Sequence, residues 1–217
     1  MALAIFDLDE TLIHGDCASL WSEQMVRLSW VDGESFLRRD RELMDAYGKG
    51  HLKMEDYMAF SLEPLIGRSQ EEVEHLVEPW VEDFIEPIIF SEATRTIAAH
   101  RKAGDRILVI SASGVHLVGP IAARLGIDEY LGIDLEVVNG IYTGKTVGTL
   151  TYREGKITRL LEWLDQEEEN LEGASFYSDS RNDLPLLLKV DHPHVVNPDP
   201  VLREHAEQHG WPILHWT

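Results

Sequence analysis

Short apolar runs alternate with stretches of helical periodicity along most of this 217-residue chain. Strands are predicted where a short apolar run is bounded by turn or polar residues, over Leu3–Leu8, Arg106–Ser111, Ala174–Ser178 and His194–Asn197. Helices are predicted between and after them, over Ser91–Lys102, Val115–Leu125, Lys156–Leu164 and Asp199–His209. Strands that alternate with helices indicate an α/β fold with a parallel sheet covered by helices on both faces.

Residues 16–86 interrupt this alternation. Apolar and aromatic side chains recur there at helical spacing, as at Trp21, Met25, Tyr57, Phe60 and Trp80. Stripes of this kind usually face a core, and no convincing strand pattern accompanies them. We therefore expect a helical insertion after the first strand, lying over the carboxyl ends of the sheet. Residues 135–144 predict a β-hairpin with Asn139 and Gly140 at its turn.

Three of the predicted strands end in polar side chains. Asp7 and Asp9 follow the first strand, Ser111 the second, and Asp179 and Asp183 the third. Ligands of open α/β sheets bind outside the carboxyl ends of the strands, so these side chains share one crevice if the strands are neighbours. Two like charges beside a buried strand are costly unless a cation or a reacting group compensates them. The pattern therefore predicts a metal-assisted site.

The same residues fit phosphoryl transfer from a monoester. A carboxylate that approaches a phosphate dianion to about 4 Å, at an effective dielectric constant of about 20, is repelled by roughly 8 kcal/mol. A hard divalent cation held by Asp7 and Asp179 would offset this repulsion. Ser111 can donate a hydrogen bond to the phosphate, and Lys156 can supply a fixed cation. Lys156 stands at a predicted helix start, where its charge opposes the helix dipole. A nearby anion, such as a bound phosphate, would explain a lysine at this position.

The amino-acid composition limits the classes of molecule that this protein is expected to bind. The net charge of −20 argues against binding to nucleic acid or to an anionic membrane, because both need clustered Lys and Arg. An acidic protein that handles an anionic substrate must concentrate positive charge locally, through a metal or a few basic side chains. Cys17 is the single cysteine, so no intrachain disulfide forms. Without a signal peptide or a membrane-spanning apolar run, we expect a cytoplasmic protein. The oligomeric state is not readable from the sequence.

The chain resembles the haloacid dehalogenase (HAD) superfamily, in the branch that contains phosphoserine phosphatases. The motif Asp-x-Asp-x-Thr stands at residues 7–11, the Ser motif at Ser111, the lysine motif at Lys156, and the Asp-x-x-x-Asp motif at residues 179–183. The resemblance implies a three-layer, Rossmann-like core made of residues 1–15 and 87–217. It also implies that the helical insertion, residues 16–86, is a cap. We expect this cap to move so that the site can admit substrate, with hinges near His14-Gly15 and Glu86-Pro87, where the insertion leaves and rejoins the core.

The resemblance also implies a role for each matching residue. Asp7 is the nucleophile that forms an aspartyl-phosphate, and Asp9 protonates the leaving alkoxide and then deprotonates the attacking water. The phosphate is held by Ser111, the Ala112 N–H and Lys156. The implied cofactor is Mg²⁺, with a ligand set made of Asp7, the Asp9 backbone carbonyl and Asp179, supported by Asp183 and Asn182. Asn182 is also among the implied substrate-binding residues.

The expected substrate is a small phosphomonoester. Phosphoserine phosphatases read the substrate amine with a Glu, and this chain has Asp16 at that place. Their carboxylate-binding arginine has no clear equivalent; the candidates are Arg38, Arg39, Arg41 and Arg181. A substrate that has an amine but no carboxylate suits this pattern, so histidinol phosphate ranks above phosphoserine as the expected substrate. The chain as a whole is also similar to histidinol-phosphate phosphatases of this fold. His14 and His116 are further candidates for substrate contact, although lone histidines are more often structural.

The sequence leaves three alternative functions open. The phosphoryl group can pass from the aspartyl-phosphate to an acceptor other than water, which makes the protein a phosphotransferase. A lipid phosphate is another substrate class, disfavoured because the sequence has no membrane segment. The third reading is a non-catalytic, phosphometabolite-binding regulatory protein, against which the retention of every chemical residue weighs.

Overall fold

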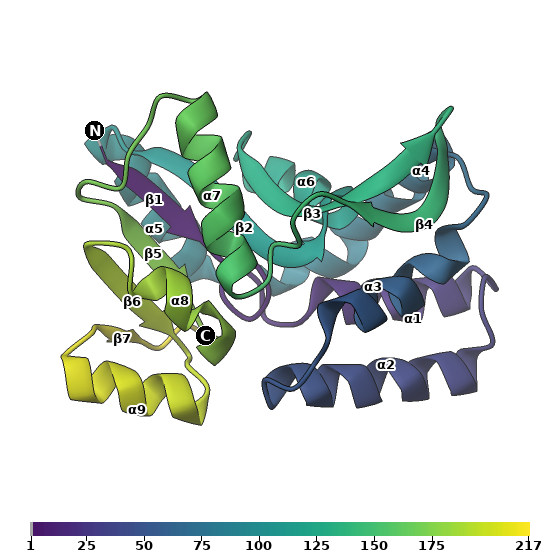
Figure 1. Cartoon of the computed structure of the whole chain (residues 1–217), viewed down its shortest axis with the longest axis horizontal. Helices are drawn as coiled ribbons and strands as arrows, with labels where there is room; N and C mark the ends of the chain where they lie inside the picture. The colour runs from purple at the N-terminus through teal and green to yellow at the C-terminus, as the bar shows by residue number, and fades with distance from the viewer. Residues whose placement is uncertain (1) are drawn as a thin grey trace.

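The computed structural model describes residues 2–217 and shows a central sheet between two helical layers (Figure 1). Over these residues the sheet has seven strands in the order β4-β3-β2-β1-β5-β6-β7, and β3 and β4 form its antiparallel pair. The strands are β1 (Leu3–Phe6), β2 (Arg106–Gly114), β3 (Tyr130–Val138), β4 (Ile141–Val147), β5 (Ser175–Ser178), β6 (His192–Val196) and β7 (Ile213–Leu214). The predicted α/β class and the predicted hairpin are confirmed.

The side chains of β1 alternate between two apolar clusters, one on each face of the sheet. Ala4 and Phe6 belong to the cluster that includes helices α5 and α6, whereas Leu3 and Ile5 belong to the cluster that includes α7, α8 and α9. These helices are α5 (Ser91–Ala103), α6 (Val115–Arg124), α7 (Glu154–Gln166), α8 (Leu184–Leu187) and α9 (Pro200–His209). A strand that is apolar on both faces is what a doubly covered parallel sheet requires, so the three-layer arrangement follows from the sequence.

The helical insertion between β1 and α5 forms where its periodicity predicts. Its helices are α1 (Cys17–Arg27), α2 (Gly33–Gly48), α3 (Met54–Leu62) and α4 (Gln70–Trp80), and the chain continues through a π-helical turn over Val81–Ile85. Side-chain oxygens of Asp16, Asp32 and Ser69 cap α1, α2 and α4. The insertion meets the β3–β4 hairpin, beside which α3 lies (Figure 1). Over residues 2–217 no helix combines the length and apolarity that a bilayer span requires.

Several predicted strand limits are wrong. β1 ends at Phe6 because the chain turns at once: three backbone N–H groups, of residues 11–13, donate to the Leu8 carbonyl, and Glu10 has a φ of 54°. β2 continues past Ser111 to Gly114 through a register shift against β3. β6 begins and ends earlier than predicted, and β7 is too short to give an alternation pattern. These shifts matter most around Asp7 and Ser111, whose surroundings they determine.

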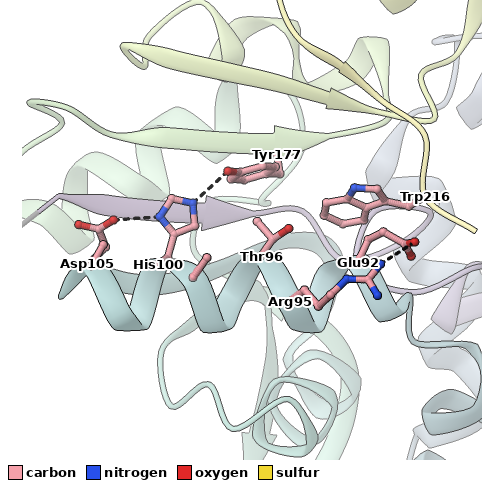
Figure 2. Close-up of a pocket in the computed structure, with 9 residues that line it drawn as sticks. Glu92, Arg95, Thr96, His100, Asp105, Tyr177 and Trp216 are labelled. Carbon is pink, nitrogen blue, oxygen red and sulfur yellow. Dashed lines mark hydrogen bonds and ion pairs between the residues drawn. The ribbon is translucent and has the colours of Figure 1, made fainter.

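A series of hydrogen-bonded polar side chains joins α5 to the sheet at a surface pocket (Figure 2). His100 Nδ1 lies 2.9 Å from an Asp105 carboxylate oxygen, and His100 Nε2 lies 2.9 Å from the Tyr177 hydroxyl. The Tyr177 ring stacks on Phe6 and on His194, with centroid separations of 4.6 and 4.5 Å. The Tyr177 carbonyl accepts the N–H of Asp7 at 2.9 Å. The stack therefore supports the backbone at Asp7, the first polar residue after β1.

We expect His194→Phe to reduce the loss of stability in acid. Burial lowers the pKa of His194 to about 4, and the neighbouring His100 and His192 add to the effect. An unfolded histidine titrates near about 6.5. The folded state therefore binds fewer protons between these values, and its stability falls as the pH decreases through that range. Phenylalanine keeps the stack on Tyr177 and removes the titration. Thermal melts at pH 7 and pH 5 should show a smaller decrease of Tm in the variant; equal decreases would contradict this prediction.

Candidate active site

The strands β2, β1 and β5 are neighbours, so the residues that follow them meet at one edge of the sheet, as predicted. The centre of this cluster is the ammonium group of Lys156, which is 1% exposed. Its Nζ donates to an Asp7 carboxylate oxygen and to an Asp183 carboxylate oxygen, each at 2.8 Å. Ser178 Oγ donates to the same Asp183 oxygen at 2.8 Å. The structure thus brings the first, lysine and acidic motifs into direct contact.

Lys156 reaches this position because α7 starts against a close backbone approach. A Cβ atom at Gly155 would lie 1.9 Å from the Leu150 carbonyl oxygen, so this position requires glycine. Arg153, just before the helix, has a φ of 52°, which is uncommon for a residue other than glycine. Together these features place Lys156 in the first turn of α7, where its charge opposes the helix dipole. The neighbouring carboxylates of Asp7 and Asp183 supply the compensating negative charge.

Asp9 lies on the side of the site that faces the insertion. One of its carboxylate oxygens accepts the Cys17 N–H at 2.7 Å, and the other accepts the Ser113 hydroxyl at 2.9 Å and the Ser111 hydroxyl at 3.3 Å. Ser111 is held in turn by the Thr151 hydroxyl, which donates to the Ser111 carbonyl at 2.7 Å. Ser113 is not among the residues predicted from the sequence. Its signal is the position two residues after Ser111, because alternate residues of a strand share a face.

The site has more negative charge than its lysine can balance. Burial raises the pKa of Asp7 to about 7; Lys156 opposes this rise, whereas Asp183 and Asp9 add to it. Burial, followed by the charges of Asp7 and Asp183, raises the pKa of Asp179 well above its usual range. Burial alone lowers the pKa of Lys156, but the carboxylates of Asp183 and Asp7 outweigh that effect and raise it. Lys156 therefore stays charged at neutral pH.

The donor chemistry of this cluster fits a hard divalent cation. Mg²⁺ commonly uses one or two protein carboxylates and fills its octahedron with water or substrate oxygens. Asp7, Asp179 and the Asp9 backbone carbonyl offer oxygen donors of this kind. Within residues 2–217, no group of three or more His, Cys, Asp and Glu side chains is arranged to hold a metal unaided. The fit rests on the oxygen donors and on the raised pKa of Asp179, since a bound cation would offset both the burial of this carboxylate and its repulsion by Asp7 and Asp183.

The end of α2 contacts the site from the insertion. Asn182 Nδ2 donates to the Tyr47 carbonyl at 3.2 Å, and Arg153 Nε donates to Asn182 Oδ1 at 3.2 Å. Arg153 also donates to the Gly50 carbonyl. Burial and the charges of the site aspartates, Asp7 foremost, raise the pKa of Tyr47 well above its usual range, as expected for a ring close to the carboxylates. Asn182, predicted near the substrate, thus makes its hydrogen bonds to the insertion and to residues before α7.

The structure places the other predicted residues less centrally. Asp16 caps α1 by accepting the Ser19 N–H at 2.7 Å, and burial together with the Asp9 charge raises its pKa to about 8. Ala112 lies in β2 at the register shift. Arg181 is bound to Asp199, which accepts its backbone N–H at 2.6 Å and its Nε at 3.3 Å. The other arginine candidates are exposed on α2, namely Arg38, Arg39 and Arg41.

Comparison with known proteins agrees with this geometry. The model of the haloacid dehalogenase-like hydrolases matches residues 4–188. The chain belongs to this family. It is also 37% identical to a histidinol-phosphatase of Neisseria meningitidis serogroup C (strain 8013), across 99% of this chain and 98% of that relative. The family and this relative, matched along almost its whole length, identify the protein as a phosphatase of the haloacid dehalogenase family.

Solved structures support the fold. A protein of unknown function from Bordetella pertussis Tohama I has a TM-score of 0.91 and 35% identity to this chain, over 98% of this chain and 97% of that one. A substrate-bound phosphoserine phosphatase complex has a TM-score of 0.72 at 21% identity, over 98% of this chain and 92% of that one. The second likeness concerns the fold alone. Both agree with the three-layer core that the sequence predicted.

Proposed function

We propose that this phosphatase is a Mg²⁺-dependent phosphomonoesterase that works through an aspartyl-phosphate on Asp7. The observation that carries the proposal is the buried ammonium of Lys156, held at 2.8 Å between the carboxylates of Asp7 and Asp183. An ammonium in this position opposes the effect of burial and favours the ionised form of Asp7, which is the form that attacks, and it offers a cationic partner to an incoming phosphate oxygen. A purely structural ion pair does not need the two further acids, Asp9 and Asp179, that lie beside it.

The proposed reaction proceeds in two displacements at phosphorus. An Asp7 carboxylate oxygen attacks phosphorus, the bond from phosphorus to the ester oxygen breaks, and Asp9 gives its proton to the leaving alkoxide. Asp9, now a carboxylate, takes a proton from water, and the hydroxide formed attacks phosphorus and releases inorganic phosphate from Asp7. Ser111 and Lys156 hold the phosphate oxygens throughout. The hydrogen bonds from Ser113 and Cys17 orient Asp9 for both proton transfers.

Magnesium is the proposed cofactor, with Asp7, Asp179 and the Asp9 carbonyl as ligands and Asp183 as support. When bound, the ion lowers the repulsion between the Asp7 carboxylate and the phosphate dianion. Asp183 receives hydrogen bonds from Lys156 and Ser178, which suits it to positioning these groups.

We propose that the insertion, residues 16–86, acts as a cap on a core made of residues 1–15 and 87–217. The contacts of Asn182 and Arg153 with Tyr47 and Gly50 support a closed position in which water is kept from the reacting phosphate. Substrate entry then requires the cap to open, with hinges near His14-Gly15 and Glu86-Pro87. Gly15 has a φ of 144°, a conformation that few other residues adopt.

The proposed substrate is a small amino-alcohol phosphate, with histidinol phosphate ranked first. The 37% identity to a histidinol-phosphatase supports this ranking, as does the pairing of Arg181 with Asp199, which removes one candidate partner for a substrate carboxylate. Asp16 suits a substrate amine. The net charge of −20 disfavours nucleic acid as a partner, and the lone cysteine, Cys17, which is buried and free, agrees with a cytoplasmic location.

The test is phosphate release from a panel of histidinol phosphate, phosphoserine, ethanolamine phosphate and an aryl phosphate, with Mg²⁺ or with EDTA. We expect release that requires Mg²⁺ and is fastest, by kcat/KM, for histidinol phosphate. Hydrolysis of histidinol phosphate no faster than that of the aryl phosphate would overturn the ranking. Full activity in EDTA would overturn the proposed cofactor. Added alcohols test the transferase alternative, because a phosphotransferase would form new phosphate esters from them instead of inorganic phosphate alone.

A further inference from the structure

The carboxylate of Asp9 is bound by the insertion on one side and by the core on the other. Its Oδ1 accepts the backbone N–H of Cys17, the first residue of α1, at 2.7 Å. Its Oδ2 accepts the Ser113 hydroxyl at 2.9 Å and the Ser111 hydroxyl at 3.3 Å. The two oxygens of this carboxylate therefore differ in the kind of donor that they contact.

The donors at the two oxygens suit different protonation states of Asp9. A backbone N–H can only donate, so its short bond to Oδ1 favours a form of Asp9 in which Oδ1 carries no proton. A hydroxyl can rotate, so that Ser113 donates to Oδ2 of the carboxylate but accepts the O–H of the carboxylic acid. Ser113 can thus stay bonded to Asp9 in both forms. A residue that acts first as an acid and then as a base, as proposed for Asp9, uses both forms in each turnover.

Ser111 cannot replace Ser113 in this role once a phosphate is bound. Its hydroxyl has one proton, and the proposed function directs that proton to a phosphate oxygen. The 3.3 Å bond to Asp9 is then given up. The Ser111 oxygen also accepts the Ser113 N–H at 3.0 Å, which helps to hold it beside Asp9. Ser113 is therefore the hydroxyl that stays with Oδ2 while the phosphate occupies the site.

We infer that Ser113 is a positioning residue for proton transfer, and that its hydroxyl keeps the transferable proton of Asp9 on Oδ2. This oxygen lies next to Ser111, the proposed phosphate partner, whereas Oδ1 contacts the backbone of α1. The inference rests on the proposed phosphatase mechanism and assigns its acid–base step to one atom.

The proton moves with the first displacement at phosphorus. An Asp7 oxygen forms the new bond to phosphorus, and the bond from phosphorus to the ester oxygen breaks with its electron pair on that oxygen. In the same step the Asp9 Oδ2–H bond breaks, the proton goes to the ester oxygen, and an alcohol leaves. Asp9 remains as a carboxylate, to which Ser113 now donates, and it then takes a proton from the attacking water.

The experiment measures how the effect of removing the Ser113 hydroxyl depends on the leaving group. Ser113→Ala keeps the backbone N–H that bonds to Ser111, so the proposed phosphate contact survives. Histidinol phosphate and ethanolamine phosphate, both alkyl phosphates, need a proton on the leaving oxygen, whereas para-nitrophenyl phosphate releases a stable phenolate without one. The ratio kcat/KM covers the steps up to the first displacement. We expect it to fall about 10- to 100-fold for the alkyl phosphates and less than about twofold for the aryl phosphate.

Two further variants calibrate this result. Asp9→Asn removes the transferable proton itself, so its losses should depend on the leaving group in the same way and be at least as large. Ser175→Ala is the matched control, because Ser175 is a strand serine, 8% exposed, at the start of β5 and so at the opposite end of the sheet from the site. Its kcat/KM should stay within about twofold of wild type for every ester. Retained hydrolysis of the aryl phosphate also shows that Ser113→Ala folds.

The outcomes separate the role of Ser113 from the phosphatase mechanism. Losses of equal size for alkyl and aryl phosphates in Ser113→Ala would overturn the inference, because general damage to the site does not depend on the leaving group. Unchanged values for all the esters would overturn it as well. Either result, together with the expected dependence in Asp9→Asn, leaves the proposed mechanism in place. If Asp9→Asn lacks that dependence, Asp9 is not the acid and the proposed mechanism is wrong; if the wild-type protein hydrolyses none of these esters, the proposed function itself is wrong.

Discussion

Asp7→Asn should abolish phosphate release, with a fall in kcat of about 10⁴-fold or more. An amide has the shape of the carboxylate but is a far weaker nucleophile, so no aspartyl-phosphate forms. The fold should survive, because Lys156 keeps its 2.8 Å contact with Asp183. The substitution also removes a charge that burial disfavours, as the raised pKa of Asp7 indicates. Phosphate release with Mg²⁺ and histidinol phosphate is the direct measurement.

A second measurement identifies the covalent step. Acid quenching of wild-type protein with radiolabelled substrate should trap a protein-bound phosphate that hydroxylamine removes, whereas Asp7→Asn should trap none. Asp191→Asn is the matched control, since Asp191 is a hydrogen-bonded aspartate just before β6, at the opposite end of the sheet from the site; its activity should stay within about twofold of wild type. Wild-type activity in Asp7→Asn, or equal labelling of both proteins, would contradict the mechanism.

The sequence was sufficient for the parts of the site that depend on topology. Asp7, Ser111 and Asp179 follow neighbouring parallel strands, so their meeting needs only the correct strand order. Lys156 could be assigned to the site because it stands at a predicted helix start, where a lysine is unfavourable unless an anion lies nearby. The two apolar faces of β1 likewise predicted helices on both sides of the sheet, which the two clusters confirm.

Contacts that depend on local backbone conformation could not be predicted. Ser113 reaches Asp9 only because β2 continues through a register shift. Arg153 reaches Gly50 across 103 residues of sequence, from a position with positive φ that no periodicity marks. Arg181 was a candidate for the substrate, yet a partner 18 residues away, Asp199, holds it. Such contacts arise from tertiary packing, whereas patterns in a sequence report faces and spacing.

Lys156→Met should both destabilise the protein and suppress its activity. Methionine fills much of the volume of lysine but leaves Asp7 and Asp183 buried without their shared cation. Breaking a buried ion pair by removing one partner costs about 3–5 kcal/mol. At about 2–4 °C per kcal/mol for a chain of this size, the Tm should fall by roughly 10 °C. The activity should fall by about 10²- to 10³-fold, since the phosphate loses a fixed positive charge.

A double variant separates the two effects of this lysine. Adding Asp183→Asn to Lys156→Met removes one of the unpaired charges, so part of the lost Tm should return while the activity stays low. Lys145→Met, at an exposed position on β4, is the control and should change the Tm by no more than about 2 °C. A Lys156→Met protein as stable as wild type would show that the carboxylates do not need the cation. Recovery of activity in the double variant would show that Lys156 serves the fold and not the phosphate.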